Sequence, residues 1–410
     1  MNISSRIACT LVGGLIFGTA LAQNDVLIIG REGGRCAEDA ACFNRIHPAV
    51  PMAAQAAPGQ TIVFKTRNAG DYQPNPASTY EDPRGEQPYT SAVHPLTGPV
   101  YVEGAAAGDV LAVTILDIDP ADYGYTRIVS IGFVTDLIEG PAQALWRLNR
   151  QEAVSDDIPG VRIPNASFPG IVTTLPGPAE HATMLARETE LLTAGGAVNP
   201  PNPEFAVPTS LCGREGSQRD ACLRTGPQRE HGGNMDIRYL GVGVTIYLPC
   251  YINGCGLAIG DLHFAQGDGE VSGTAIEMDA DVTLTTRVIK DGPGLPRGPH
   301  YEGPSRLLDI PSRRFYATTG FPLKREGEVP PDMAYLESAK VAGLENLSKD
   351  ISLAARNALL EMIDYMVANY GLTREQAYLV ASVAVDLRIG QLVDAPNVGV
   401  TAILPLDIFE

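Results

Sequence analysis

The spacing of apolar residues changes along the chain from a strand pattern to a helix pattern. Over most of its length, short apolar runs are separated by glycines, prolines and polar residues, as is typical of strands joined by turns. The strands predicted in this way cover residues 25–30, 61–67, 110–118, 244–248, 257–259, 271–276 and 282–289. Between residues 135 and 229 the alternation breaks down into long loops, with one candidate helix at 182–192. Loops of this length inside a compact domain are usually functional or insertions.

A helical pair is predicted near the C-terminus, in about residues 346–388. The first helix carries an apolar stripe that we expect to contact the core, and Gly371 ends it. Thr373 and Gln376 form a capping box that opens a second helix, which runs to about Asp386. A last strand at residues 398–404 is predicted to return the chain to the sheet. The stripe consists of Ile351, Ala355, Leu359, Met362, Met366 and Tyr370.

Composition supports a mainly β globular protein. The chain has 410 residues, 44% of them hydrophobic, so it can bury a sizeable core as one large domain or two fused ones. Its 43 glycines and 32 prolines favour many short strands over long helices. The formal net charge of −18 argues against nucleic acid or an anionic membrane as a partner, because both select basic surfaces.

The N-terminal segment has the features of a secretory signal peptide. Arg6 precedes an apolar run at residues 7–17, and the small residues Ala20 and Ala22 provide a cleavage site. We therefore predict that residues 1–22 are removed and that the mature protein, residues 23–410, is secreted or periplasmic. No later apolar stretch has the length that a transmembrane helix needs.

Six cysteines remain once Cys9 is removed with the leader. In an oxidising compartment, close cysteine pairs predict disulfides that close loops, here Cys36/Cys42, Cys212/Cys222 and Cys250/Cys255. The second pair would close an insertion at about residues 199–227. Reactive thiols are the alternative, and the spacing of a zinc ribbon is absent.

The polar residues with the most informative spacing lie within residues 231–277. Asp261 and His263 are two positions apart, and so are Asp268 and Glu270. Residues two apart on an extended chain point to the same side, and the glycines around them permit sharp bends. We therefore expect both pairs to converge on one small volume.

These residues allow metal chemistry. Asp236, Asp261 and His263, joined by His94 from a proline-rich loop, offer the mixed nitrogen and oxygen ligands that a zinc-like ion accepts. Such an ion lowers the pKa of water and polarises a carbonyl, while a free carboxylate of the same stretch moves the proton. The alternative is that these are turn and cap residues whose carboxylates accept backbone hydrogen bonds.

Several nucleophile-based hydrolase designs are excluded. No G-x-S-x-G elbow occurs, the Gly/Ser-rich stretch of Ser-Ser-Lys amidases is missing, and the chain has only five lysines. A cysteine nucleophile would have to escape oxidation outside the cytoplasm, and only Cys250 and Cys255 lie near the polar stretch. A hydrolase built on these residues would therefore use activated water.

Four segments closely resemble the acetamidase/formamidase family. They are residues 94–104 (HPLTGPVYVEG), 233–236 (GNMD), 260–277 (GDLHFAQGDGEVSGTAIE) and 385–398 (VDLRIGQLVDAPNV), in the same order as in the family. The resemblance implies a mainly β fold with a β-sandwich or jelly-roll-like core. It also implies hydrolysis of short carboxamides, such as formamide and acetamide, to acid plus ammonia, and assembly into a homo-oligomer. The leader, the cysteines and the insertion are not typical of cytosolic members.

The resemblance further implies a divalent metal, zinc or calcium, near the second and third segments. The matching positions here are Asp236, Asp261 and His263. Other polar residues of the four segments are candidates for catalysis (Glu270, Glu277 and Asp268) and for substrate binding (His94, Asn234 and Gln266).

Two other functions stay open at this point. One is hydrolysis of a larger or cyclic amide, with the loops of residues 135–229 reshaping the entrance to the site. The other is a non-catalytic jelly-roll protein that captures a small ligand. The second predicts a pocket without convergent carboxylates.

Overall fold

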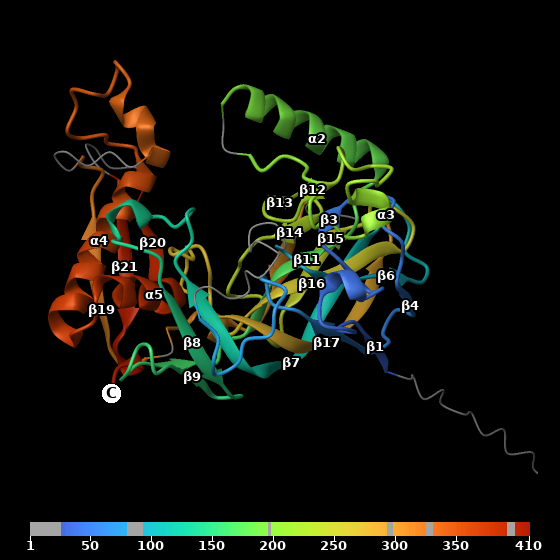
Figure 1. Cartoon of the computed structure of the whole chain (residues 1–410), viewed down its shortest axis with the longest axis horizontal. Helices are drawn as coiled ribbons and strands as arrows, with labels where there is room; N and C mark the ends of the chain where they lie inside the picture. The colour runs from blue at the N-terminus through green and yellow to red at the C-terminus, as the bar shows by residue number, and fades with distance from the viewer. Residues whose placement is uncertain are drawn as a thin grey trace, which may run out of the picture.

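The computed structural model describes residues 26–79, 93–195, 198–292, 298–310, 312–324, 331–391 and 398–410. The predicted signal peptide, residues 1–22, lies outside the described residues. Within them the fold is mainly β, as predicted, with one large and mostly antiparallel sheet and few helices (Figure 1).

The main sheet is built around two long paired strands. β7 (Val110–Arg127) and β17 (Glu277–Ile289) run antiparallel along almost their whole length. β17 pairs in turn with β16 (Cys255–His263), β16 with β11 (Phe168–Thr173), and β11 with β14 (Gly232–Asn234). This order places β16 inside the sheet, where all nine of its residues are buried.

Shorter elements extend this frame. The other strands of the main sheet are β1 (Leu27–Ile29), β2 (Cys42–Phe43), β4 (Ala54–Ala56), β5 (Ile62–Thr66), β6 (Leu96–Val102), β8 (Gln143–Leu148), β9 (Glu152–Val154), β10 (Arg162–Pro164), β13 (Gln228–Arg229), β15 (Thr245–Pro249) and β18 (His300–Glu302). Two short strands form a sheet of their own, β3 (Arg45–Ile46) and β12 (Leu223–Arg224).

Two helices precede the C-terminal part, α2 (Pro178–Thr193), which contains the candidate helix, and α3 (Thr209–Cys212). Short 3₁₀ helices are η1 (Cys36–Glu38), η2 (Thr135–Leu137), η3 (Ser305–Leu308), η5 (Leu406–Ile408) and the longer, kinked η4 (Pro331–Glu337).

The strand predicted at residues 271–276 is wrong, whereas the other predicted strands are present. These residues form turns between β16 and β17. Gly273 has a φ of +87°, which a strand does not allow. The backbone of this segment pairs with a neighbouring loop, since Phe133 N–H donates to Val271 O at 2.8 Å. Its apolar residues are buried as a packed loop rather than as a strand.

The predicted helical pair is confirmed as α4 (Ile351–Tyr370) and α5 (Arg374–Ala384). Gly371 follows α4 with a φ of +67°, the left-handed conformation that ends many helices. The Thr373 hydroxyl oxygen accepts a hydrogen bond from Gln376 N–H, and Gln376 Oε1 accepts one from Thr373 N–H. This is the predicted capping box.

The final strand is present as β21 (Gly399–Pro405), but it does not return to the main sheet as predicted. It lies between β19 (Phe315–Gly320) and β20 (Asp386–Gln391) in a separate three-stranded sheet. α4 packs against this small sheet, and a Cβ on Gly320 would collide with the α4 backbone. α4 thus packs on a separate sheet, at the left of Figure 1, while Leu359, Met362 and Met366 of its apolar stripe join the main core as predicted.

All three predicted local disulfides are present. Their Cα–Cα separations lie in the usual range for disulfides, at 5.2 Å for Cys36–Cys42, 5.7 Å for Cys212–Cys222 and 4.6 Å for Cys250–Cys255. The alternative of reactive thiols is therefore not supported.

None of the helices in the described ranges has the length and apolar composition to cross a bilayer.

Residues 199–227, which we call the excursion, lie between α2 and β13. The Cys212–Cys222 disulfide closes the excursion, and β12 joins its end to β3. Arg45 Nε and Nη2 donate to the backbone oxygen of Asn202 at 3.1 and 3.0 Å. The excursion is thus fastened to the rest of the fold at several points.

The disulfides predict the behaviour of the protein towards an alkylating reagent. Denatured but unreduced protein should show no added mass for these six cysteines, whereas reduced protein should take up label at all of them. Intact mass spectrometry with iodoacetamide measures this. Label on two or more cysteines without reductant would contradict the assigned pairs.

Candidate active site

Five of the predicted residues meet where β16 ends and β17 begins. His263 is the last residue of β16 and pairs with Glu277, the first residue of β17. Asp261 lies two residues earlier in β16, Asp236 follows β14, and Glu270 comes from the loop between β16 and β17. We call these five residues the His263 cluster.

His263 lies at the centre of this cluster. Its Nε2 atom is 3.4 Å from Glu277 Oε1, 3.5 Å from Asp261 Oδ1 and 3.8 Å from Glu270 Oε1. Asp236, Asp261 and His263 offer ligand atoms that all lie within 4.8 Å of one another, and His263, Glu270 and Glu277 do the same. The convergence predicted from the sequence is therefore found for these five residues.

Three of the acids reach the cluster from an unusual backbone conformation. The φ angles of Asp236, Asp261 and Glu270 are +47°, +56° and +43°. Residues other than glycine rarely adopt such values, and those that do concentrate at functional sites. The conformation turns these side chains out of the regular alternation of a strand and towards His263.

Several buried polar atoms of the cluster have no hydrogen-bond partner among the described residues. They are Asp236 Oδ1, Asp261 Oδ1, Glu277 Oε2 and both ring nitrogens of His263. Buried polar atoms are normally paired, so a group of unpaired ones indicates a ligand. Carboxylates with one imidazole are a donor set for a divalent cation such as zinc, and the carboxylates alone suit calcium. The residues therefore fit the predicted cation.

Burial and mutual charge control protonation in the cluster. Desolvation, followed by the charge of Asp261, raises the pKa of Asp236 to about 8. Burial raises the pKa of Glu277 to about 6, and burial together with Asp236 raises that of Glu270 well above its ordinary value. Burial also acts to raise the pKa of the Asp261 carboxyl. The charges of His94 and His263 outweigh this effect, so the pKa of Asp261 is lowered. Burial opposes a charged His263, yet Glu277 and Asp261 raise its pKa well above the ordinary value.

The cluster opens into a cavity of about 690 Å³. Asp261, Glu270 and Glu277 line this cavity, together with His94 and Asn234. His94 Nε2 lies 3.8 Å from Asp261 Oδ2, and burial lowers the pKa of its ring. A cavity of this size with convergent polar groups is typical of a small-molecule site.

Two predicted residues occupy other positions. The structure does not bring Asp268 into the cluster, because its Oδ2 accepts a hydrogen bond from the Tyr239 hydroxyl at 2.7 Å. Gln266 Nε2 donates to the backbone oxygen of Asp236 at 2.8 Å, so this side chain supports a member of the cluster. Asn234 does line the cavity, and its Oδ1 has no partner among the described residues.

Gly170 in β11 is a residue of the site that the sequence did not reveal. A Cβ at this position would lie 2.6 Å from Asp236 Oδ1 and 2.9 Å from His263 Cε1. The Gly170 backbone oxygen also accepts a hydrogen bond from Asp236 N–H at 3.3 Å. β11 therefore approaches the cluster so closely that only glycine fits without displacing it. A single glycine in an apolar run carries no signal for this role.

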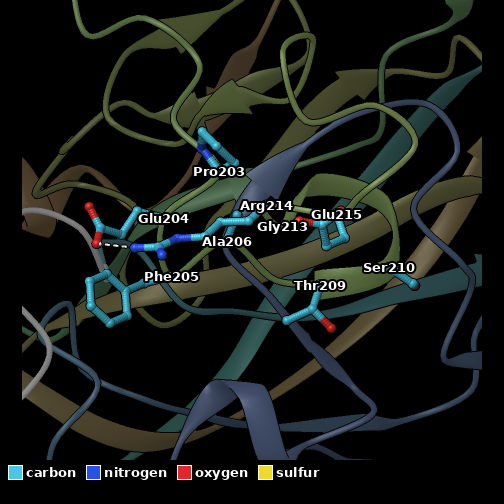
Figure 2. Close-up of a pocket in the computed structure, with 9 residues that line it drawn as sticks. All are labelled: Pro203, Glu204, Phe205, Ala206, Thr209, Ser210, Gly213, Arg214 and Glu215. Carbon is cyan, nitrogen blue, oxygen red and sulfur yellow. Dashed lines mark hydrogen bonds and ion pairs between the residues drawn. The ribbon is translucent and has the colours of Figure 1, made fainter.

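The outer wall of the cavity comes from α2 and the excursion. Glu188 and Leu191 of α2 line it, with Asn202 and Arg224 of the excursion. The sequence places the loops of residues 135–229 at the entrance for a larger or cyclic amide, but nothing in it singles out these side chains. The excursion also forms a separate, outward-facing pocket, where Figure 2 shows Arg214 paired with Glu204 at 2.8 Å.

Comparison with known proteins identifies the family. The model of the acetamidase/formamidase family matches residues 33–410. The chain belongs to this family. The resemblance seen in the sequence is thereby confirmed, and so is the prediction of an amidase.

Individual relatives match most of this chain with most of their own length. A formamidase of Methylophilus methylotrophus is 31% identical over 91% of this chain and 90% of its own length. An acetamidase of Mycolicibacterium smegmatis is 32% identical over 82% of this chain and 84% of its own length. Among solved structures, a gamma lactamase from Delftia acidovorans superimposes with a TM-score of 0.82 at 30% identity, covering 94% of this chain and 93% of that one.

The close approach of β11 generates a prediction. Replacing Gly170 with alanine should displace Asp236 or His263, because the new methyl group meets both side chains. We expect kcat/KM for amide hydrolysis to fall by at least about tenfold and stability by about 1–3 kcal/mol. Ammonia release and thermal unfolding measure the two effects.

Gly140→Ala is the matched control, because a Cβ at Gly140 meets no atom within 4 Å. This variant should retain the activity and melting temperature of the parent. An active Gly170→Ala protein with unchanged kcat/KM would show that the tight fit is not needed for catalysis.

Proposed function

We propose that this protein hydrolyses primary carboxamides to a carboxylate and ammonia at the His263 cluster. The observation that carries the proposal is the convergence of four carboxylates around one imidazole, where three of the carboxylates line a cavity of about 690 Å³. Relatives named formamidase and acetamidase support the reaction type. Convergent carboxylates argue against a non-catalytic binding protein.

We propose that Asp236, Asp261 and His263 hold a divalent cation, zinc or calcium. The unpartnered atoms of these residues and their mutual distances support this assignment. A cation bound there would polarise the amide carbonyl and lower the pKa of water. The cavity-facing residues would orient the amide, with Asn234 Oδ1 and the His94 ring within its reach.

Glu277 is the proposed general base. Its Oε1 atom accepts a hydrogen bond from Ala275 N–H at 3.0 Å, which orients the carboxylate, while Oε2 has no partner among the described residues. Oε2 would take a proton from the attacking water as the carbon–oxygen bond forms. The carbon–nitrogen bond then breaks, and Glu277 or Glu270 delivers a proton to the departing nitrogen. One amide and one water give one carboxylate and one ammonium ion.

Hydrolysis of a larger or cyclic amide is the second candidate. The cavity volume favours it, and so does the overall similarity to the gamma lactamase. In both cases the chemistry at the cluster is the same, and only the part of the substrate that contacts the outer wall differs.

Export is part of the proposal. The leader-like residues 1–22 and the three disulfides support a secreted or periplasmic location, because disulfides persist in oxidising compartments. Assembly into a homo-oligomer stays a prediction.

Ammonia release from formamide and acetamide tests the function. Treatment with a chelator should abolish the activity, and zinc or calcium should restore it. His263→Ala should be inactive and lose the bound metal, as measured by elemental analysis. Full activity of both the chelated protein and His263→Ala would exclude the role of a metal.

Glu277→Gln tests the base separately. It should lower kcat about 100- to 10,000-fold, the usual contribution of a general base, with a smaller effect on KM. Glu190→Gln, an exposed carboxylate on α2, is the control and should behave like the parent protein. Equal kcat values for Glu277→Gln and the parent would remove Glu277 from the mechanism.

A further inference from the structure

The cavity extends well beyond the His263 cluster. Its volume of about 690 Å³ lies inside the range of roughly 300–1,000 Å³ that holds drug-sized molecules. Formamide or acetamide would fill only a small part of it. Its lining also includes the apolar side chains of Val93, Val129, Ile131, Leu191 and Val198. These side chains suit the methylene groups of a longer substrate.

Arg224 adds a positive charge to the same wall. It lies on β12, is partly buried and lines the cavity. Its charge reaches the site: burial is the main cause that lowers the pKa of the His94 ring, Asp261 opposes this effect, and the charges of His263 and Arg224 add to it. The next residue, Thr225, accepts a hydrogen bond from the His94 backbone at 2.6 Å. Arg224 is therefore connected to the segment that carries His94 through its chain neighbour Thr225.

The backbone of Arg224 is well fixed. It pairs with Arg45 in the β3–β12 ladder, and its carbonyl oxygen accepts a hydrogen bond from Arg229 Nη1 at 2.8 Å. The Cys212–Cys222 disulfide closes the loop just before it. A charged group on such a rigid support can recognise a ligand with little loss of conformational freedom.

Two charged groups lie near Arg224 among the described residues. Arg45 is its partner in the β3–β12 ladder and has a pKa lowered to about 9 by burial and by Arg224. Glu188 also lines the cavity, but Arg229 pairs with both of its oxygens, at 2.6 and 2.9 Å. The lining of the cavity thus combines acids of the His263 cluster, the Arg224 guanidinium and apolar residues.

We propose that Arg224 determines specificity and that the substrate is a primary carboxamide whose acyl chain ends in a carboxylate, a monoamide of a dicarboxylic acid. This inference rests on the proposed amidase function. The amide lies at the cluster, the methylene groups contact the apolar wall, and the carboxylate binds the Arg224 guanidinium, which suits planar oxyanions. Hydrolysis of this substrate gives a dicarboxylate and ammonium.

Matched substrates test the proposal. Succinamate and glutaramate end in a carboxylate, whereas butyramide and valeramide carry a methyl group in its place. The parent enzyme should prefer the charged member of a pair by roughly 10- to 100-fold in kcat/KM, the effect of one hydrogen bond to a charged group. Arg224→Gln should remove most of this preference, mainly through KM, and Arg224→Lys should retain part of it. Arg224→Glu should favour 4-aminobutyramide over succinamate.

Arg214→Gln is the matched control, since Arg214 belongs to the same excursion but pairs with Glu204 in the outer pocket (Figure 2). It should keep the substrate preference of the parent. Binding of glutarate, measured by calorimetry, gives a readout without catalysis and should weaken roughly 10- to 100-fold in Arg224→Gln.

The experiments distinguish a failure of the role of Arg224 from a failure of the proposed amidase function. Hydrolysis of neutral amides without a preference for carboxylates would overturn the role of Arg224 and leave the amidase function intact. A lack of ammonia from every amide would overturn the proposed function, and glutarate binding would then decide on Arg224 alone. A preference or a glutarate affinity that persists unchanged in a folded Arg224→Gln protein would also overturn the inference.

Discussion

The constraint on which this structure depends is the burial of several carboxylates around one imidazole. Like charges in a medium of low polarity persist only where protons, cationic side chains or a bound cation compensate them. The fold holds these acids together nevertheless. Register between β16 and β17 sets His263 opposite Glu277, and a backbone hydrogen bond to β11 holds Asp236. The absence of a side chain at Gly170 leaves the space in which they meet. The cluster is thus a product of strand pairing, and its charge balance is what the proposed cation would complete.

The C-terminal part of the chain supports this arrangement from the other side. The loop that carries Glu270 is held by α5 and β20, since Gly267 N–H donates to Ser382 O at 2.9 Å and Leu387 N–H to Asp268 O at 3.2 Å. Asp386 completes the connection, because it accepts a hydrogen bond from Asp268 N–H at 3.2 Å and forms an ion pair with Arg238. The C-terminal helical pair and its small sheet therefore hold the loop that carries Glu270 in place.

Sequence reasoning succeeded where local spacing decides the outcome. The capping box at Thr373 and the helix end at Gly371 depend on neighbouring residues only, and the three disulfides join cysteines at most ten positions apart. The rule that residues two apart on a strand share a side explains neither expected pair, because Asp261 and Glu270 have φ angles of +56° and +43° and leave the extended conformation. Asp261 nevertheless meets His263, whereas Asp268 does not join Glu270 in the cluster. Gly170 and Arg224 act through contacts between distant parts of the chain, which no local pattern reports. The strand expected at residues 271–276 failed because apolar residues are buried in packed loops as well as in strands.

The chemistry and the recognition proposed for this protein involve different parts of the chain. The residues of the His263 cluster belong to the segments that resemble the acetamidase/formamidase family, whereas the outer wall of the cavity includes residues of α2 and of the excursion. A disulfide and the β3–β12 ladder make this excursion as well fixed as a core element. An enzyme can then change which acyl group it accepts by exchanging side chains on the excursion, without disturbing the balance of charges around His263. Thr225 of the excursion is hydrogen-bonded to the His94 backbone. A shift of the excursion would therefore move both His94, which is proposed to orient the amide, and Arg224, which is proposed to bind the other end of the substrate.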